Sequence, residues 1–117
     1  MTDIPILDMC AFERMKKEIR TSGIKWLVDL YIQEVPNYLA NIRRALADND
    51  KEALYLAAHK FKGGSANLGA KLVVTLCKQI EETSRNGSFE EMREQFSRLE
   101  DAVQKTTAEL KIQKEQA

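Results

Sequence analysis

The chain has 117 residues, 44% of them hydrophobic and 31% charged, and its 18 basic and 18 acidic side chains cancel. Length and apolar content predict one domain, residues 1–117, with an ordinary core. A neutral chain without a basic block lacks the charge pattern of nucleic-acid-binding proteins, so we expect no nucleic-acid partner. Its apolar runs are too short to span a bilayer and its N-terminal residues MTDIPILD do not resemble a secretion signal, so we expect a cytoplasmic protein with no membrane partner.

The two cysteines, Cys10 and Cys77, are predicted to be reduced, because thiols stay reduced in the cytosol. One histidine and two distant cysteines do not make a usual zinc site. We therefore expect no metal and no cofactor in this chain.

The first two predicted helices differ in length. A short amphipathic helix is expected over residues 7–20, with Asp8 as its N-cap and residues 21–23 as its end. A long helix follows over about 25–47, and Pro36 should bend it because proline removes a backbone donor. Its predicted apolar face consists of residues three or four apart: Leu27, Leu30, Tyr31, Val35, Tyr38, Ile42 and Leu46.

The third and fourth helices are predicted over residues 51–68 and 70–85. Asp50 can cap the third helix, and Gly69 is placed to end it. The fourth helix has Leu72, Leu76, Ile80 and Thr83 at helical spacing.

The last helix begins near residue 89, after a capping box of Ser88 and Glu91. Its apolar residues alternate three and four apart: Phe89, Met92, Phe96, Leu99, Val103, Thr106 and Leu110. No pattern indicates a β-strand or an internal repeat. We predict an all-α fold, an antiparallel up-down four-helix bundle with a short extra N-terminal helix, and a monomer.

His59, the only histidine, is predicted to point to solvent. On a helical wheel it lies about 160° from Phe61, the centre of the apolar face of the third helix. Lys62 and Gly63, three and four residues further on, lie beside it, and so do the bulky Tyr55 and Leu56, four and three residues before it.

Two adjacent glycines, Gly63 and Gly64, interrupt this helix. Each costs about 1 kcal/mol relative to alanine in a helix interior. Gly64 is predicted to face inward, where a neighbouring helix can approach closely. Gly63 is predicted to face outward beside His59, where a missing side chain gives a large partner access to the imidazole.

The stretch HKFKGGSANLG, residues 59–69, resembles the signature of histidine-containing phosphotransfer (HPt) domains. The matching positions are His59, Phe61, Lys62, Gly63, Gly64, Ser65, Leu68 and Gly69. The surrounding helices, including the segment YIQEVPNYLANIRRAL, are also similar to that family. The resemblance implies a phosphorelay intermediate that carries a phosphoryl group between aspartates of receiver domains, with an upstream (hybrid) histidine kinase.

The resemblance also implies roles for single residues. His59 matches the phosphorylated residue, Lys62 the lysine that steadies the phosphoryl oxygens, and Gly63 the glycine that lets the receiver approach, while Lys60 could add positive charge. Glu81, 22 residues after the histidine, matches a position that hydrogen-bonds the imidazole; the alternative is an ordinary solvated charge. The receiver would dock on Tyr55, Leu56 and Ala66 and would bring its own Mg²⁺.

Two other functions stay open at this point. A helical adaptor that binds a receiver or a partner helix without transfer would not need His59. An enzyme with His59 as general base would need a pocket, and a convex helix face is a poor place for one. The sequence has no nucleotide-binding motif, so we do not expect a kinase or another enzyme.

Overall fold

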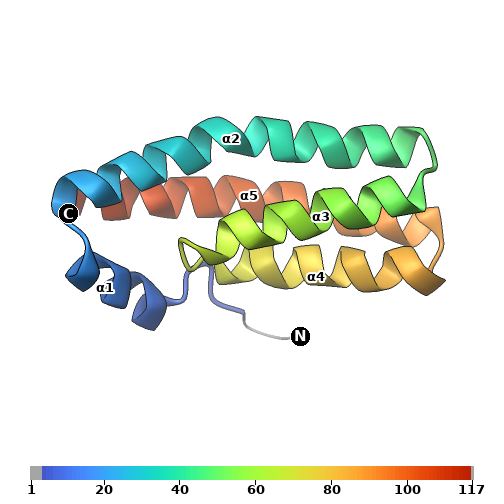
Figure 1. Cartoon of the computed structure of the whole chain (residues 1–117). Coiled ribbons are helices and arrows are strands. Elements are labelled where there is room, and N and C mark those ends of the chain that lie inside the picture. Colours follow the sequence, from blue (N-terminus) through green and yellow to red (C-terminus); the bar gives the residue numbers. More distant parts are fainter. Residues whose placement is uncertain (1–3, 117) are drawn as a thin grey trace.

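The computed structural model describes residues 4–116, and these form five α-helices without a strand. In chain order the helices are α1 (Met9–Glu18), α2 (Thr21–Ala47), α3 (Lys51–Ala66), α4 (Lys71–Asn86) and α5 (Phe89–Gln116). α3 packs against α2 and α4, and α5 packs against the same two helices, so α2 to α5 form an antiparallel bundle with α1 at one end (Figure 1). The predicted all-α four-helix bundle with an extra N-terminal helix is confirmed.

Side-chain caps mark three of the helix starts where the sequence predicts them. Asp8 and Asp50 each accept a hydrogen bond from the backbone N–H three residues on, at 3.1 and 3.0 Å. At the start of α5, the Ser88 hydroxyl accepts from the N–H of Glu91 at 3.1 Å, and the Ser88 N–H donates to the Glu91 carboxylate at 3.2 Å. Each contact satisfies a donor that has no partner within its own helix.

Two predicted helix boundaries are wrong. Residues 21–23 form the first turn of α2 rather than the end of α1, because Arg20 is extended and its carbonyl accepts from the N–H of Ile24 at 3.0 Å. α3 ends at Ala66 rather than at residue 68. Gly69 lies beyond it with a φ of 67°, in the turn that leads into α4. Glycine adopts this left-handed conformation without the cost that a side chain would bring.

Phe61, the predicted centre of the apolar face of α3, is fully buried. The predicted face of α5 is buried except for Phe89, which is half-buried. The faces of α2 and α4 differ further from the prediction. Leu30 of α2 is 39% exposed. On α4, Leu72, Leu76 and Thr83 are only half-buried, and the buried stripe consists of Val73, Cys77, Ile80, Glu81 and Ser84. Since α4 contacts both α3 and α5, its most buried residues are those that face between these two helices.

α2 continues through Pro36 without a break and changes direction near its middle (Figure 1). Pro36 is exposed, on the side of the helix away from the core. The predicted bend is present, and the helix remains one element.

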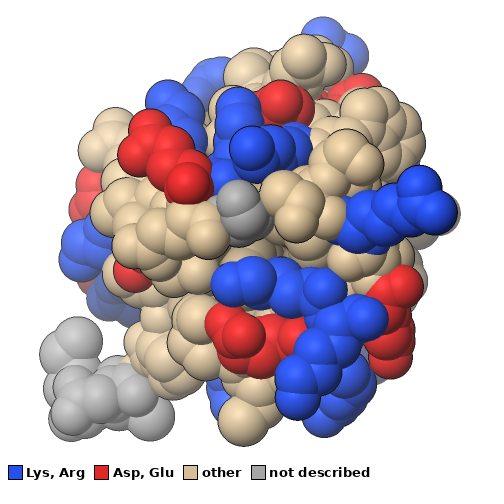
Figure 2. Space-filling model, turned by 90° about the vertical axis from the view of Figure 1, so that its left-hand side faces the viewer, with Lys and Arg blue, Asp and Glu red and all other residues tan. Residues whose placement is uncertain are grey.

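The end of the bundle near α1 is closed by the N-terminal segment. Phe12 is fully buried there, and the N–H of Asp8 donates to the carbonyl of Gly69 at 2.7 Å. Basic and acidic side chains are interspersed over this end, without a broad area of one sign (Figure 2). None of the helices described is both long and apolar enough to cross a bilayer.

Candidate functional site

The site lies on the outer face of α3, next to α4. α3 buries Leu54, Ala58, Phe61 and Ser65 in the core. These core contacts set the rotation of the helix, and His59 comes to lie on the opposite side with 59% of its side chain exposed. The predicted orientation of His59 toward solvent is confirmed.

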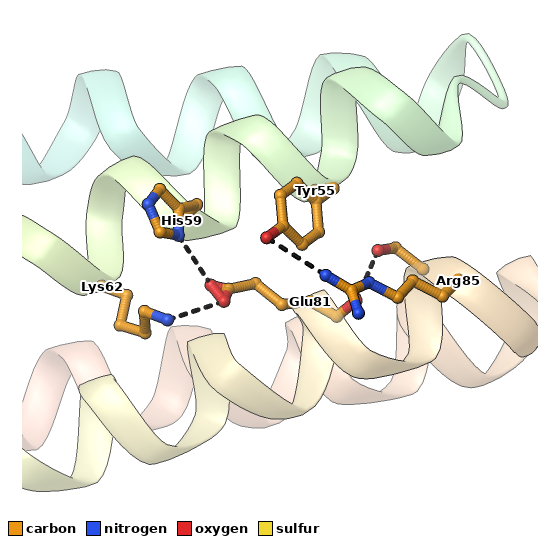
Figure 3. Close-up of polar contacts among 6 residues, drawn as sticks. Tyr55, His59, Lys62, Glu81 and Arg85 are labelled. Carbon is orange, nitrogen blue, oxygen red and sulfur yellow. Dashed lines mark hydrogen bonds and ion pairs between the residues drawn. The ribbon is translucent and has the colours of Figure 1, made fainter.

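Glu81 joins His59 and Lys62 from α4. One of its carboxylate oxygens, Oε2, lies 3.2 Å from His59 Nδ1, and the other, Oε1, accepts from Lys62 Nζ at 2.7 Å (Figure 3). Only 8% of the Glu81 side chain is exposed. An ionised carboxylate accepts hydrogen bonds and does not donate them. In the neutral imidazole this contact therefore favours the tautomer with the hydrogen on Nδ1, which leaves the lone pair on Nε2 free.

Burial makes these two contacts more important than ordinary surface ion pairs. A carboxylate removed from water without partners is strongly destabilising, whereas Glu81 has a cation on one oxygen and a ring N–H on the other. The alternative of a solvated Glu81 is therefore wrong. The carboxylate is fixed in place and holds the imidazole by one nitrogen.

Tyr55 and Arg85 form a second contact between α3 and α4, one turn away. The Tyr55 ring is parallel to the His59 ring, with an interplanar angle of 8° and 5.9 Å between centroids. The Arg85 guanidinium carbon lies 5.3 Å from the centre of the Tyr55 ring, and Nη2 donates to the Tyr55 hydroxyl at 3.4 Å. Figure 3 shows Tyr55 between His59 and Arg85.

The two glycines of α3 have different surroundings. A Cβ on Gly63 would meet nothing within 4 Å, so the surface beside His59 is open there. A Cβ on Gly64 would lie 2.7 Å from the Tyr38 hydroxyl oxygen of α2. The predicted outward and inward orientations are both confirmed, and Gly64 makes room for a side chain of α2.

Comparison with known proteins adds an independent observation. A family model described as the Hpt domain matches residues 27–109, most of the chain. The chain belongs to the Hpt domain family. Comparison with curated protein sequences finds no match.

Solved structures of Hpt proteins are similar over almost the whole chain. The histidine-containing phosphotransfer protein B (HptB) from Pseudomonas aeruginosa PAO1 is 26% identical, with a TM-score of 0.89 and 97% of each chain covered. The HPT domain of a sensor hybrid histidine kinase from Shewanella is 25% identical, with a TM-score of 0.71 over 94% of this chain and 92% of that one. A putative histidine-containing phosphotransfer protein from rice shares the fold at 17% identity, with a TM-score of 0.84 over 95% and 84% of the two chains. The protein is thus a histidine phosphotransfer protein of phosphorelays and not a kinase.

The other predicted site residues, Leu56, Lys60 and Ala66, are spread over the exposed side of α3. Leu56 is 57% exposed. Together with Lys60 it lines a groove of about 350 Å³ between α2 and α3, on the other side of the helix from Glu81. Ala66 is exposed at the end of α3. Lys60 therefore lies apart from the Glu81 carboxylate, while Lys62 is bound to it.

Tyr55 is only half-buried on α3 and Arg85 is exposed on α4, and sequence reasoning missed the contact between them. One signal for it exists. Tyr55 is four residues before His59 and Arg85 is four residues after Glu81. On antiparallel helices this spacing puts the second pair one turn from the first. Within residues 4–116, no three His, Cys, Asp or Glu side chains come together as a metal site requires.

Proposed function

We propose that His59 carries the phosphoryl group, accepting it from an aspartyl phosphate of one receiver domain and passing it to an aspartate of another. The observation that supports this most directly is an exposed imidazole whose Nδ1 is occupied by the buried Glu81 carboxylate. Nε2 is then the nucleophile. Gly63, four residues further along α3, leaves the surface beside His59 open to a partner.

The chemistry of the step explains the carboxylate. The Nε2 lone pair forms a bond to phosphorus while the bond from phosphorus to the aspartate oxygen breaks, and the aspartate leaves with the electron pair. The ring retains its Nδ1 hydrogen and becomes positively charged. Glu81, at 3.2 Å from Nδ1, stabilises this charge as it develops. The reverse step returns the ring to the neutral state, so transfer can run in both directions.

Lys62 is bound to the same carboxylate as His59 and supplies a positive charge to the site. Its ammonium group is held by Glu81 at 2.7 Å, and its side chain is 27% exposed, so it can reach a phosphoryl group on Nε2 from the solvent side. Lys60, on the groove side of α3, would add a weaker field. We expect the Mg²⁺ to be bound by the receiver and no cofactor in this chain.

The receiver would dock on the exposed faces of α2 and α3. We define the receiver-docking surface as Tyr55, Leu56, Gly63 and Ala66 of α3 with Trp26 and Leu30 of α2. All are exposed except Tyr55, which is half-buried. Trp26 and Leu30 are 63% and 39% exposed, and Leu30 lines a groove that reaches Gly64 of α3 and Asn67, the residue after this helix. Exposed apolar side chains around an uncovered histidine fit a protein partner better than a small substrate.

Receivers and histidine kinases are the partners of Hpt domains. We infer that this protein is cytoplasmic and acts as a monomer, and that it has no enzymatic activity of its own. Sedimentation at the concentration of the transfer assay would test the oligomeric state.

The test is transfer from a receiver labelled with radioactive phosphate. We expect an acid-labile, base-stable label on the wild type and none on His59→Gln, with both variants folded by circular dichroism. Glu81→Gln keeps an acceptor for Nδ1–H but removes the negative charge, so transfer should slow by about tenfold or more. The proposal would be overturned if the wild type acquired no label from any of a panel of receivers. If the unlabelled wild type nevertheless bound these receivers, the result would favour the adaptor.

A further inference from the structure

The position of Tyr55 gives it a second task that docking does not explain. Its ring lies alongside the His59 imidazole, between His59 and Arg85 (Figure 3). Arg85 contacts the same ring by its guanidinium carbon, at 5.3 Å, and by a hydrogen bond to the hydroxyl. Tyr55 is thus in contact with groups on both sides, and one of them is the predicted nucleophile.

The contact with Glu81 does not by itself fix the imidazole. A histidine side chain rotates about two bonds, and a half turn of the ring exchanges Nδ1 with a carbon atom. Water competes for the ring nitrogens because 59% of the side chain is exposed. The Tyr55 ring, parallel to the imidazole, favours ring orientations in that one plane. Of the two such orientations, which differ by a half turn, only the one with Nδ1 toward Glu81 makes the observed hydrogen bond.

Arg85 in turn restricts Tyr55. The tyrosine side chain is only half-buried, and the guanidinium over its ring provides a cation–π contact in addition to the hydrogen bond. Two adjacent side-chain pairs therefore connect the outer faces of α3 and α4. One consists of His59 with Glu81, and the other of Tyr55 with Arg85.

We propose that Tyr55, held by Arg85, is a positioning residue that keeps His59 Nδ1 on Glu81 and Nε2 toward the partner. As far as it concerns transfer, the proposal rests on His59 being the phosphorylated residue. The orientation of the ring itself is independent of that function and can be measured in the resting protein.

The first measurement is the tautomer of His59 from long-range ¹H–¹⁵N NMR spectra, which report which ring nitrogen carries the hydrogen. His59 is the only histidine, so its signals need no assignment. We expect the Nδ1–H form in the wild type and in Tyr55→Phe, which retains the stacked ring. Tyr55→Leu should shift the population toward Nε2–H, and Arg85→Gln should do so to a smaller extent.

The second measurement is the rate at which phosphoramidate, a small donor that needs no docking surface, phosphorylates His59. Nε2 forms the bond to phosphorus, the phosphorus–nitrogen bond of the donor breaks, and ammonia leaves. Tyr55→Leu should slow this reaction by roughly threefold to tenfold, the usual weight of ordering one side chain. Tyr55→Phe should react like the wild type.

Each outcome decides the matter. If Tyr55→Leu changes neither the tautomer nor the phosphoramidate rate, Tyr55 has no positioning role, even where transfer from receivers is slower; it then acts in docking. If the tautomer shifts as expected while no receiver labels the wild type, the positioning role stands and the proposed function fails. Should Tyr55→Leu not fold, Arg85→Gln provides the same test, because it leaves both α3 residues in place.

Discussion

Gly63 and Gly64 are neighbours in sequence, yet alanine should have opposite effects on stability at the two positions. A Cβ on Gly63 meets nothing within 4 Å, and the position is exposed within α3. Gly63→Ala therefore gains only the higher helix propensity of alanine. The free energy of unfolding should rise by about 1 kcal/mol, which raises Tm by roughly 4 °C in a protein of this size.

Gly64→Ala gains the same propensity and adds a clash. The new Cβ would lie 2.7 Å from the Tyr38 hydroxyl oxygen and 3.2 Å from Cζ. The Tyr38 ring stacks on Phe61 with 4.8 Å between centroids, so Tyr38 cannot shift without disturbing a core contact. Overpacking of this kind costs about 1–3 kcal/mol, which cancels or exceeds the gain of about 1 kcal/mol. We expect Gly64→Ala to be less stable than Gly63→Ala by about 1–3 kcal/mol.

Urea unfolding followed by circular dichroism measures both variants against the wild type. Equal effects at the two positions, or a loss of stability in Gly63→Ala, would refute the assignment of their surroundings. A longer side chain then tests access to His59. Gly63→Gln should be at least as stable as the wild type but slow transfer from a receiver by about tenfold or more, with Gly63→Ala between the two. Unchanged transfer in Gly63→Gln would show that the open surface beside His59 has another cause.

Three further predictions concern the core. The Tyr31 and Ser65 hydroxyl groups are 2.6 Å apart and buried. Tyr31→Phe leaves Ser65 without this partner, so the free energy of unfolding measured in urea should fall by about 1–3 kcal/mol. The double variant with Ser65→Ala should recover part of this loss. Burial, with a smaller contribution from Glu81, raises the pKa of the Cys77 thiol to about 12, so a thiol reagent near neutral pH should label only the exposed Cys10 until the protein unfolds; rapid labelling of both would contradict this. Because the pKa of Cys77 is raised from its ordinary 9.0 and burial also raises that of Tyr31, the folded state holds these protons more tightly than the unfolded state. The free energy of unfolding should thus be fully maintained below about pH 9 and fall as the pH rises toward 12; a constant value between about pH 8 and 11 would contradict this.

Local signals predicted most of the fold because they act within one helix. Asp8, Asp50 and the pair Ser88 and Glu91 cap their helices as expected, since a cap needs only its own backbone. The boundary at residues 21–23 was wrong for the same kind of reason. Thr, Ser and Gly are common outside helices, but nothing in their local chemistry prevents them from forming the first turn of α2.

The site divides in the same way. The outward direction of His59 and Gly63 follows from their spacing to Phe61 on one helix, and the structure shows it. The approach of Glu81 and Arg85 depends on how far α4 is shifted and rotated against α3. That register results from packing of the whole core, including the burial of Val73 and Cys77 rather than Leu72 and Leu76. No pattern within α4 alone determines it.

The charges around Glu81 also explain why a carboxylate is compatible with a phosphoryl acceptor. With the imidazole in its neutral form, the Lys62 ammonium balances the buried Glu81 carboxylate, so the group of three carries no net charge. On the proposed reaction the imidazole ring becomes positive and takes over the neutralisation of Glu81, which frees the Lys62 ammonium to pair with the phosphoryl oxygens. The repulsion between Glu81 and the phosphoryl group is thus reduced by the positive ring that lies between them. A glutamine at this position would hold Nδ1 equally well but would leave the charge on the ring uncompensated, and this difference is what the Glu81→Gln variant measures.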